Sequence, residues 1–167
     1  AVLLDVKTGK VLAMVSRPTL DPDDFNGKPL TQEQVDYYFR DIPTGLRNRA
    51  IQGSYVPGST FKPVTGMAAL EAGKVEPTDS IVCTGRYWYP PFIKCTKAHG
   101  RVNFYSAMAV SCNTYFQEMA RRAGIAQIGR VGMEFGLGQA TGIDLPFEGT
   151  GLLPHLEWQK EEFLARA

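Results

Sequence analysis

The strand-forming signal is confined to the beginning of the chain, and this limits what the 167 residues can fold into. Residues 2–6 and 10–17 are rich in β-branched and apolar side chains, and the turn Lys7-Thr8-Gly9 between them predicts an antiparallel hairpin. Two strands do not make a stable sheet alone. We therefore expect an incomplete α+β fold, in which this hairpin precedes a mostly helical part and its partner strands lie in a longer protein.

Helical spacing dominates the rest of the chain. Residues 59–72 carry one apolar stripe that Gly73 ends, and Pro63 in the first turn predicts a distorted start. Thr31 and Gln34 occupy capping-box positions. The expected segments are a short helix over 31–39, an irregular stretch over 43–58, a long excursion over 75–101, helices over 103–110, 113–123 and 125–135, and a helical tail from 156.

Composition narrows the class of protein. Hydrophobic residues make up 44% and charged residues 21%, which is typical of a globular domain with its own core. A net charge of +1 argues against a nucleic-acid partner. Apolar runs such as residues 11–15 are too short to span a bilayer, and no signal peptide opens the chain. We interpret residues 1–167 as part of one domain and expect any membrane anchor to lie outside it.

The strongest chemical signal is the pair Ser59 and Lys62, three residues apart at a helix start. That spacing puts both side chains on one face. A serine hydroxyl becomes a nucleophile when a base takes its proton, and lysine is a base only when neutral, which burial and a helix N-terminus both favour. Backbone N–H groups of the same helix start would supply half of an oxyanion hole. The alternative is an ordinary helix cap beside a solvated lysine, which the short pattern alone does not exclude.

A second motif, Ser111-Cys112-Asn113, lies between two expected helices. It fits a Ser-x-Asn motif, in which the serine relays protons and the asparagine binds a substrate amide. Serine and asparagine are common helix caps, so the motif alone is a weak signal. Because it follows a Ser-x-x-Lys helix in the right order, it predicts a catalytic site made of Ser59, Lys62, Ser111 and Asn113.

With both motifs in place, the sequence resembles the class B penicillin-binding proteins, and within them it is most similar to the penicillin-binding protein 2 group. The resemblance implies a partial penicillin-binding/β-lactamase-like transpeptidase fold, of which the chain holds the N-terminal hairpin and the mostly helical subdomain. It runs the whole length, with family landmarks at residues 4–14, 21–22, 48–50, 57–63, 99–100, 111–116, 135–138, 141–146, 151–154 and 158.

The resemblance also implies an activity, peptidoglycan D,D-transpeptidation. Ser59 would be acylated by a stem peptide ending in D-Ala-D-Ala, D-Ala would leave, and an amine on a neighbouring strand would attack the acyl-enzyme. β-Lactam antibiotics would acylate the same serine, and catalysis would need no cofactor. The full-length protein would work with the cell-elongation machinery at the periplasmic face of the bacterial inner membrane.

One family feature is missing from its usual place. The third motif of the family, Lys-Thr-Gly or Lys-Ser-Gly on a strand after Ser-x-Asn, is not found there, and Lys7-Thr8-Gly9 is interpreted as a hairpin turn. We therefore expect this chain to be catalytically impaired by itself. A β-lactam sensor domain and a serine β-lactamase remain alternatives, although neither usually needs a segment such as residues 21–50. A lactamase also deacylates quickly, so a penicilloyl adduct that lasts for hours would exclude it.

Cys83, Cys95, His99 and Cys112 form a second constellation, separated by eleven, three and twelve residues. Three thiolates and one imidazole can hold a structural zinc ion in a tetrahedral site, which would tie the excursion of residues 75–101 to the Ser-x-Asn loop. The alternative is a Cys83–Cys95 disulfide, with Cys112 as a small buried residue and His99 in a structural role. Similar ligands occur at these places in some members of the penicillin-binding protein 2 group, which favours zinc.

Overall fold

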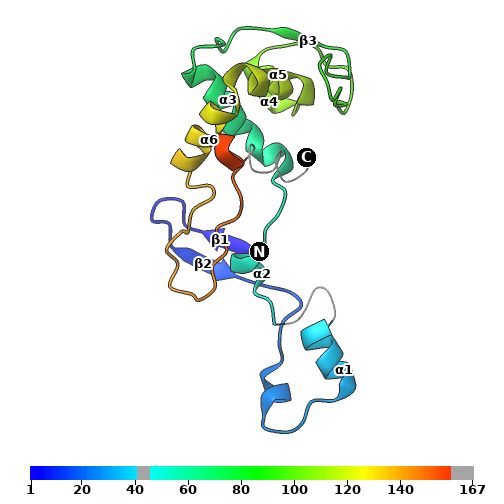
Figure 1. Cartoon of the computed structure of the whole chain (residues 1–167), viewed down its shortest axis with the longest axis vertical. Helices are drawn as coiled ribbons and strands as arrows, with labels where there is room; N and C mark the ends of the chain where they lie inside the picture. The colour runs from blue at the N-terminus through cyan, green and yellow to red at the C-terminus, as the bar shows by residue number, and fades with distance from the viewer. Residues whose placement is uncertain (41–45, 159–167) are drawn as a thin grey trace. The chain divides into compact units, whose positions relative to one another are not determined.

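The computed structural model describes residues 1–40 and 46–158. The chain divides into two compact units (Figure 1). Unit 1 consists of Ala1–Ser54 with Gly142–Gly149, and unit 2 consists of Tyr55–Thr141 with the segment that begins at Thr150. None of the described helices is long and apolar enough to cross a membrane.

Unit 1 begins with the predicted hairpin. β1 (Val2–Leu4) pairs antiparallel with β2 (Val11–Met14), and both strands are shorter than the sequence suggested. The Asp5 carboxylate accepts hydrogen bonds from the Thr8 N–H at 2.8 Å and the Thr8 hydroxyl at 2.9 Å. These bonds close the turn and lower the pKa of Asp5. The early Lys-Thr-Gly sequence is therefore a turn held by a local carboxylate, as its position predicted.

The rest of unit 1 is made of short helices. The capping box of Thr31 and Gln34 is confirmed, since Gln34 N–H donates to the Thr31 hydroxyl and Thr31 N–H donates to the Gln34 side chain at 2.7 Å. The irregular stretch expected over 43–58 was wrong in part, because Asn48 caps a helical turn there; its residues 43–45 lie outside the described residues. The elements are η1 (Pro22–Phe25), α1 (Gln32–Val35), η2 (Asp36–Arg40) and α2 (Arg49–Gln52).

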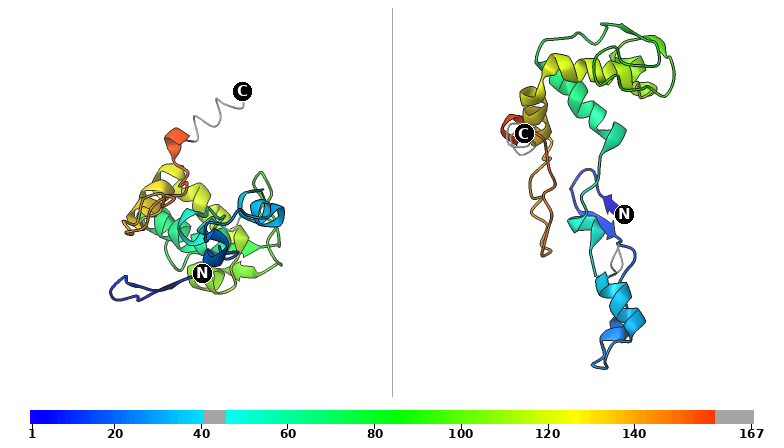
Figure 2. Two further views of the ribbon diagram at one scale, coloured as in Figure 1. Left: turned by 90° about the horizontal axis from the view of Figure 1, so that it is seen from below. Right: turned by 45° about the vertical axis from the view of Figure 1, so that its right-hand side comes forward.

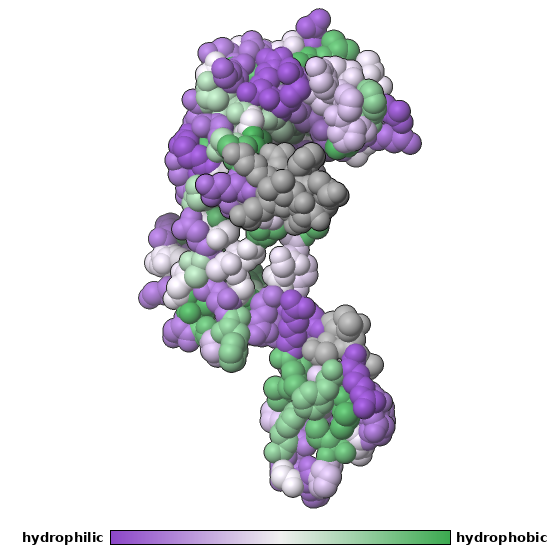
Figure 3. All heavy atoms as spheres, in the orientation of Figure 1, coloured by the Kyte–Doolittle hydropathy of each residue, from purple (hydrophilic) through white to green (hydrophobic). Residues whose placement is uncertain are grey.

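Large apolar side chains remain exposed in this unit. Figure 3 shows hydrophobic residues over the part of unit 1 that holds α1, on the face in view. Tyr38 is the exception, because its ring is buried and its hydroxyl donates to Asp24 at 2.6 Å and accepts from the Asp21 N–H at 2.9 Å. The exposed side chains include Leu20, Phe25 and Phe39.

Unit 2 contains the helices that the sequence predicted. Gly124, with φ of +77°, separates two of them, which a residue with a Cβ could do only under strain. The tail is helical over residues 156–158, and its continuation lies outside the described residues. The elements are η3 (Gly58–Phe61), α3 (Lys62–Glu71), β3 (Ile81–Cys83), β4 (Gly100–Val102), α4 (Phe104–Ala109), α5 (Asn113–Ala123) and α6 (Ile125–Glu134).

Helix α3 is the centre of unit 2, and it packs against both α5 and α6 (Figures 1 and 2). Ala68 and Ala69 on α3 are fully buried, so the neighbouring helices can approach closely. Gly66 is packed so tightly that an added Cβ would lie 2.6 Å from the Phe104 ring. Small residues on α3 therefore set the distance between the helix that carries Ser59 and the helix that carries Asn113.

The excursion over 75–101 is more ordered than expected. β3 and β4 pair antiparallel at its two ends, with Cys83 opposite Gly100. The sequence analysis missed this two-stranded sheet, because each strand has only three residues and lacks an alternating pattern. The pairing closes the excursion into a loop and brings Cys83 beside His99.

Candidate functional site

The helix that carries Ser59 starts irregularly, as Pro63 predicted. Residues Gly58–Phe61 form a 3₁₀ turn, and the regular α-helix begins at Lys62. Gly58 has φ of +57°, and nothing lies within 4 Å of a Cβ built there, so the backbone conformation and not crowding favours glycine. Ser59 is exposed at this turn. Its hydroxyl is therefore accessible to a reactant while its backbone is fixed.

The four predicted catalytic residues come together at this point. The Lys62 Nζ donates to the Ser111 Oγ at 2.7 Å, to the Ser111 carbonyl at 2.6 Å and to the Asn113 Oδ1 at 2.8 Å. The Ser111 Oγ in turn donates to the Ser59 Oγ at 3.0 Å. No direct hydrogen bond joins Lys62 to Ser59 within the described residues. Ser111 stands between the lysine and the nucleophile, which is the position expected of a serine that relays protons.

Ser111 reaches this position through an unusual backbone conformation. Its φ is +51°, in the left-handed region that a residue with a side chain enters at a cost of about 1–2 kcal/mol. The turn is held by the Ser111 N–H, which donates to the Met108 carbonyl at 3.1 Å, and by the Cys112 N–H, which donates to the Ala107 carbonyl at 2.9 Å. The junction between α4 and α5 therefore presents both the side chain and the carbonyl of Ser111 to Lys62.

Asn113 is the first residue of α5. Its side-chain oxygen, its side-chain nitrogen and its backbone N–H each make a hydrogen bond. Its Oδ1 faces Lys62, and its Nδ2 donates to the Lys94 carbonyl at 3.1 Å. Its backbone N–H donates to the Cys95 Sγ at 3.2 Å. The carboxamide can be turned in only one sense, because its oxygen meets an amine and its nitrogen meets a carbonyl. One Nδ2 hydrogen then remains for a reactant.

The electrostatics at Lys62 favour a neutral amine. Burial lowers the pKa of Lys62 below its usual value, and this effect outweighs the opposing effect of the thiols of Cys95 and Cys112. The ring of Phe116 lies 5.8 Å from the Nζ and forms part of the apolar surroundings. A larger fraction of such a lysine is neutral than of a solvated one, so the amine is more often available to act as a base.

A cavity of about 470 Å³ opens beside Ser59, between the start of α3 and one face of α5. Ser59, Lys62 and Asn113 are the predicted catalytic residues among those that line it. Helical spacing could also have found Gln117 and Ala120, because they follow Asn113 at successive intervals of four and three residues and so share its face. The lining residues are Gly58, Ser59, Phe61, Lys62, Thr65, Asn113, Phe116, Gln117 and Ala120.

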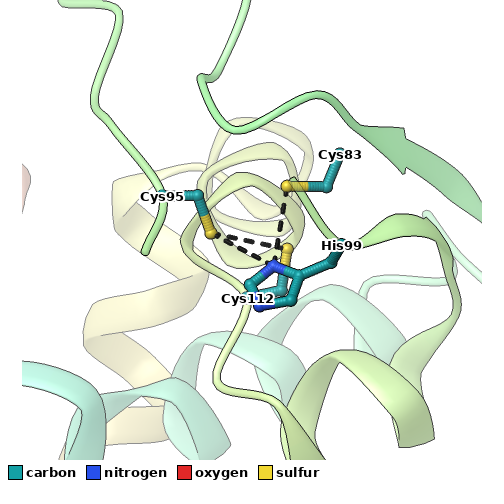
Figure 4. A group of neighbouring side chains, drawn as sticks. All are labelled: Cys83, Cys95, His99 and Cys112. Atoms are coloured by element: carbon teal, nitrogen blue, oxygen red, sulfur yellow. Dashed lines mark hydrogen bonds between the residues drawn. The ribbon is translucent and has the colours of Figure 1, made fainter. Parts of the chain in front are cut away.

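The second predicted constellation also comes together (Figure 4). Cys83 ends β3, Cys95 lies in the excursion, His99 precedes β4, and Cys112 is the cap of α5. The His99 Nδ1 lies 3.4 Å from the Cys95 Sγ and 3.7 Å from the Cys83 Sγ, and the sulfurs of Cys95 and Cys112 are 3.9 Å apart. All four ligand atoms lie within 4.8 Å of one another, and the three cysteines are free thiols.

The spacing of these atoms suits a tetrahedral zinc ion. With Zn–S bonds of about 2.3 Å and Zn–N bonds of about 2.0–2.1 Å, a tetrahedral site places sulfurs about 3.8 Å apart and a sulfur and nitrogen about 3.5 Å apart. The three separations given above are close to these values, and every pair of ligand atoms lies within 4.8 Å. Burial raises the pKa of Cys112 to about 12, whereas at the other two thiols burial is outweighed by hydrogen bonds, which lower the pKa of Cys83 to about 6 and also lower that of Cys95. Cys112 would therefore need a bound cation to ionise together with the other two thiols.

A buried carboxylate behind the site was not found from the sequence. Glu118 on α5 is 3% exposed, and it accepts hydrogen bonds from the Tyr87 hydroxyl at 2.7 Å, from Arg121 at 2.8 and 3.0 Å, and from Arg122 at 2.7 Å. Burial alone would raise the pKa of Glu118, but these donors lower it to about 2. The i, i+3 and i+4 spacing of the arginines is a visible signal, whereas the bond from Tyr87 depends on the tertiary fold.

Known proteins similar to this chain identify its family. Residues 1–167 match the family described as the penicillin-binding protein transpeptidase domain. Peptidoglycan D,D-transpeptidase MrdA of Acinetobacter baumannii is 39% identical over 163 residues, which are 95% of this chain and 24% of that protein. The chain thus spans about a quarter of the length of this relative.

Solved structures lead to the same family. Penicillin-binding protein 2 of Pseudomonas aeruginosa superposes with a TM-score of 0.85 at 34% identity, over 98% of this chain and 38% of that one. Penicillin-binding protein 2 of Helicobacter pylori, in a complex with MreC, gives 0.87 at 27% identity, over 98% of this chain and 31% of that one. The α+β fold expected from the sequence is confirmed, and the chain belongs to the penicillin-binding protein transpeptidase domain family.

Proposed function

We propose that this chain is the nucleophile-bearing part of a peptidoglycan D,D-transpeptidase of the penicillin-binding protein 2 group. The observation that carries the proposal is the hydrogen-bonded chain from Lys62 through Ser111 to Ser59. A relative 39% identical to the chain bears the name of this activity. Neither a helix cap nor a solvated surface lysine would bring these three side chains into one chain of hydrogen bonds beside a cavity.

The geometry supports acyl transfer in two steps. Ser59 Oγ attacks the carbonyl carbon of the D-Ala-D-Ala bond, and its proton passes through Ser111 Oγ to the neutral Lys62. The remaining Nδ2 hydrogen of Asn113 orients the peptide carbonyl, and the Ser59 N–H, at the helix start, stabilises the oxyanion. The C–N bond then breaks, and the proton returns to the departing D-Ala amine. An amine of a second strand attacks the ester, and Ser59 regains its proton.

Penicillin labelling tests this proposal in the natural full-length protein that carries this sequence. Wild-type protein should form a stoichiometric adduct with a fluorescent penicillin, and mass mapping should place the adduct on Ser59. Ser59→Ala should abolish labelling, whereas Ser54→Ala, a control at another exposed serine, should leave it unchanged. A wild-type protein that is not acylated, or an adduct on another residue, would refute the transpeptidase assignment.

The same adduct separates the alternative functions. A transpeptidase or a β-lactam sensor keeps the penicilloyl ester for hours, whereas a β-lactamase hydrolyses it within seconds to minutes. Cross-linking of uncross-linked peptidoglycan by the purified protein then distinguishes the transpeptidase from the sensor. The hydrogen-bonded chain from Lys62 through Ser111 to Ser59 would serve all three classes, so the MrdA relative is what favours the transpeptidase.

We also infer that Cys83, Cys95, His99 and Cys112 hold a structural zinc ion. The donor set and the separations of 3.4–3.9 Å support this inference. Metal analysis of freshly purified protein should find one zinc per chain, and His99→Asn should lose it. His155→Asn, at the other histidine of the chain, is the control and should retain zinc. Metal-free protein with a Cys83–Cys95 disulfide by mass would rule the site out.

We further propose that the full-length protein acts on peptidoglycan stem peptides at the periplasmic face of the inner membrane, together with the cell-elongation machinery. The support comes from a relative, because the Helicobacter pylori structure is described as a complex of penicillin-binding protein 2 with MreC. β-Lactams are the expected inhibitors. Fractionation of cells and co-purification of the tagged full-length protein would test the location and the partner.

A further inference from the structure

The excursion of unit 2 ends in a tight hairpin whose tip is aromatic. Arg86 and Lys94 form an antiparallel bridge at the base of the hairpin, and the Tyr87 N–H donates to the Ile93 carbonyl at 2.9 Å. The tip is closed by the Phe92 N–H, which donates to the Tyr89 carbonyl at 2.7 Å. We call Trp88, Tyr89, Phe92 and Ile93 the aromatic tip.

The aromatic tip is exposed, although a chain normally buries such side chains. Trp88 is 48% exposed, Tyr89 52% and Phe92 50%. Clustered exposed apolar side chains commonly mark a binding surface. By contrast, the ring of Tyr87 in the same hairpin is buried, with only 3% of the residue exposed. The other three rings keep about half of their surface open to a ligand.

Specific bonds hold the hairpin next to the catalytic residues. The buried Tyr87 hydroxyl donates to Glu118 on α5, and the Arg121 guanidinium lies 5.3 Å from the centre of the Tyr89 ring. At the base, the Lys94 carbonyl accepts a hydrogen bond from Asn113. These contacts fix the hairpin to α5, the helix that begins with Asn113, and the aromatic tip extends from the hairpin.

The charge around the tip has one sign. Residues 84–98 contain three basic residues and no acidic residue, and all three basic residues are exposed. Glu118, the acid that accepts a hydrogen bond from Tyr87 of the hairpin, is buried and already paired with two arginines. A ligand of this surface should therefore offer flat apolar faces together with negative charge. The basic residues are Arg86, Lys94 and Lys97.

We propose that the aromatic tip, with Arg86 and Lys94, binds the glycan strand of uncross-linked peptidoglycan next to the stem peptide that enters the site. This proposal rests on the transpeptidase function proposed above. The apolar faces of pyranose rings stack on aromatic rings, and stem peptides carry carboxylates that basic side chains attract. The cavity at Ser59, of about 470 Å³, has room for the end of one stem peptide, so a polymeric substrate must continue along the surface. The bond from Asn113, which lines the cavity, to Lys94 connects the base of the hairpin to the edge of that cavity.

The test compares a small ligand with a polymer in the natural full-length protein. The variant Trp88→Ala/Phe92→Ala should bind soluble uncross-linked peptidoglycan strands at least 10-fold more weakly than wild type and show a raised KM for cross-linking. Its rate of Ser59 acylation by fluorescent penicillin and its affinity for a sugar-free stem peptide should change less than 2-fold. Tyr105→Ala, at an exposed aromatic residue of α4, is the matched control and should behave as wild type.

A second variant tests the charges. Arg86→Ala/Lys94→Ala should weaken strand binding 3- to 10-fold in dilute buffer, and the difference from wild type should shrink in 0.5 M salt, where charge attraction is screened. Unchanged affinity for peptidoglycan strands in both variants would overturn the proposal. The exposed aromatic tip would then be a candidate contact for a protein partner. Equal losses for strands and penicillin would also overturn it, because the tip would then only support the catalytic site. Absence of Ser59 acylation in wild type is a different failure, that of the transpeptidase assignment itself.

Discussion

The two walls of the candidate site are built in different ways. Helices α3 and α5 form one wall, and their positions follow from fully buried small residues such as Ala68 and Ala69. The excursion contributes no residue to the cavity lining named above, but it holds Asn113 through Lys94 and Cys95, and in this sense it is the other wall. Its loop has few buried side chains beyond Cys83 and Tyr87. It is held instead by single hydrogen bonds and by the group Cys83, Cys95, His99 and Cys112, which we call the thiol cluster. The catalytic geometry therefore depends on the packing of many side chains between the helices, and on a small number of hydrogen bonds and thiol contacts in the excursion.

Asn113 is where the two walls meet. It accepts a hydrogen bond from Lys62 in the helical wall and donates to Lys94 and Cys95 in the excursion. Substitutions in the helical wall should therefore affect chemistry or packing locally, whereas those in the excursion should affect stability and the orientation of Asn113 together. Four substitutions test this comparison.

Replacing the base should have the largest effect and should leave the structure intact. Lys62→Ala should slow acylation of Ser59 about 1,000-fold, since positioned acid–base groups contribute roughly 10²–10⁴ in rate. Acylation measured by stopped-flow with a fluorescent penicillin checks this, and circular dichroism checks the fold. Lys74→Ala, at an exposed lysine just beyond α3, is the control. A loss below 10-fold would show that Lys62 is not the base.

Removing one ligand of the thiol cluster should weaken the excursion wall. Cys95→Ser should lose zinc and unfold about 10 °C lower, because a structural zinc site contributes several kcal/mol to folding. Acylation should slow as well, since the Asn113 N–H loses its sulfur partner. A chelator should give wild type the same unfolding temperature as the variant, and Thr96→Ala is the control. A wild type that chelators leave unchanged would contradict the comparison.

Glu118 should make the excursion wall sensitive to acid. Its folded pKa of about 2 lies below the ordinary value of 4.5. The folded state thus favours the ionised form, and the resulting stability is complete above pH 4.5 and lost as pH falls through 2. The shift corresponds to about 3 kcal/mol. Glu118→Gln should be less stable by about that amount at pH 7, and the difference should vanish near pH 2.

Chemical denaturation at several pH values measures this acid dependence. Glu134→Gln, at an exposed carboxylate of α6, should follow the wild-type curve at every pH. A constant difference between wild type and Glu118→Gln from pH 7 to pH 2 would mean that the charge of Glu118 does not hold the hairpin.

The smallest effect belongs to the helical wall. Tyr115 is fully buried, and its hydroxyl has no hydrogen-bond partner among the described residues. Tyr115→Phe removes a buried hydroxyl whose loss of hydration no hydrogen bond offsets among the described residues. The free energy of unfolding should therefore stay equal or rise by up to about 1 kcal/mol. Thermal unfolding checks this, with Tyr105→Phe on the surface as control. A clear loss of stability would show that packing alone does not define this wall.

The sequence predicted the features that depend on local pattern. The ends of α3, α5 and α6 were predicted correctly from glycine positions, and the capping box of Thr31 followed from spacing. The meeting of the four thiol-cluster residues was expected from their number and type. Such features need only neighbouring residues or a chemical rule about ligands.

Most of the features that sequence reasoning missed depend on tertiary contacts. The β3–β4 pairing joins segments about twenty residues apart with no alternating pattern, and the bond from Tyr87 to Glu118 joins a loop to a helix. The positive φ that places Ser111 between Lys62 and Ser59 is not indicated by its residue type. Two missed features are local, since Asn48 caps the four-residue helix α2 and the cavity residues of α5 follow helical spacing.

The three acceptors around Lys62 have a consequence for the direction of proton movement. In the structure the Lys62 Nζ donates to all three acceptors, which uses every hydrogen of an ammonium group. The Ser111 hydroxyl then donates its own hydrogen to Ser59. When the amine is neutral, one donor is missing, and rotation of the two hydroxyl groups reverses the order without moving a heavy atom. The same relay can therefore withdraw a proton from the nucleophile and restore it later, so both halves of the catalytic cycle share one rigid arrangement.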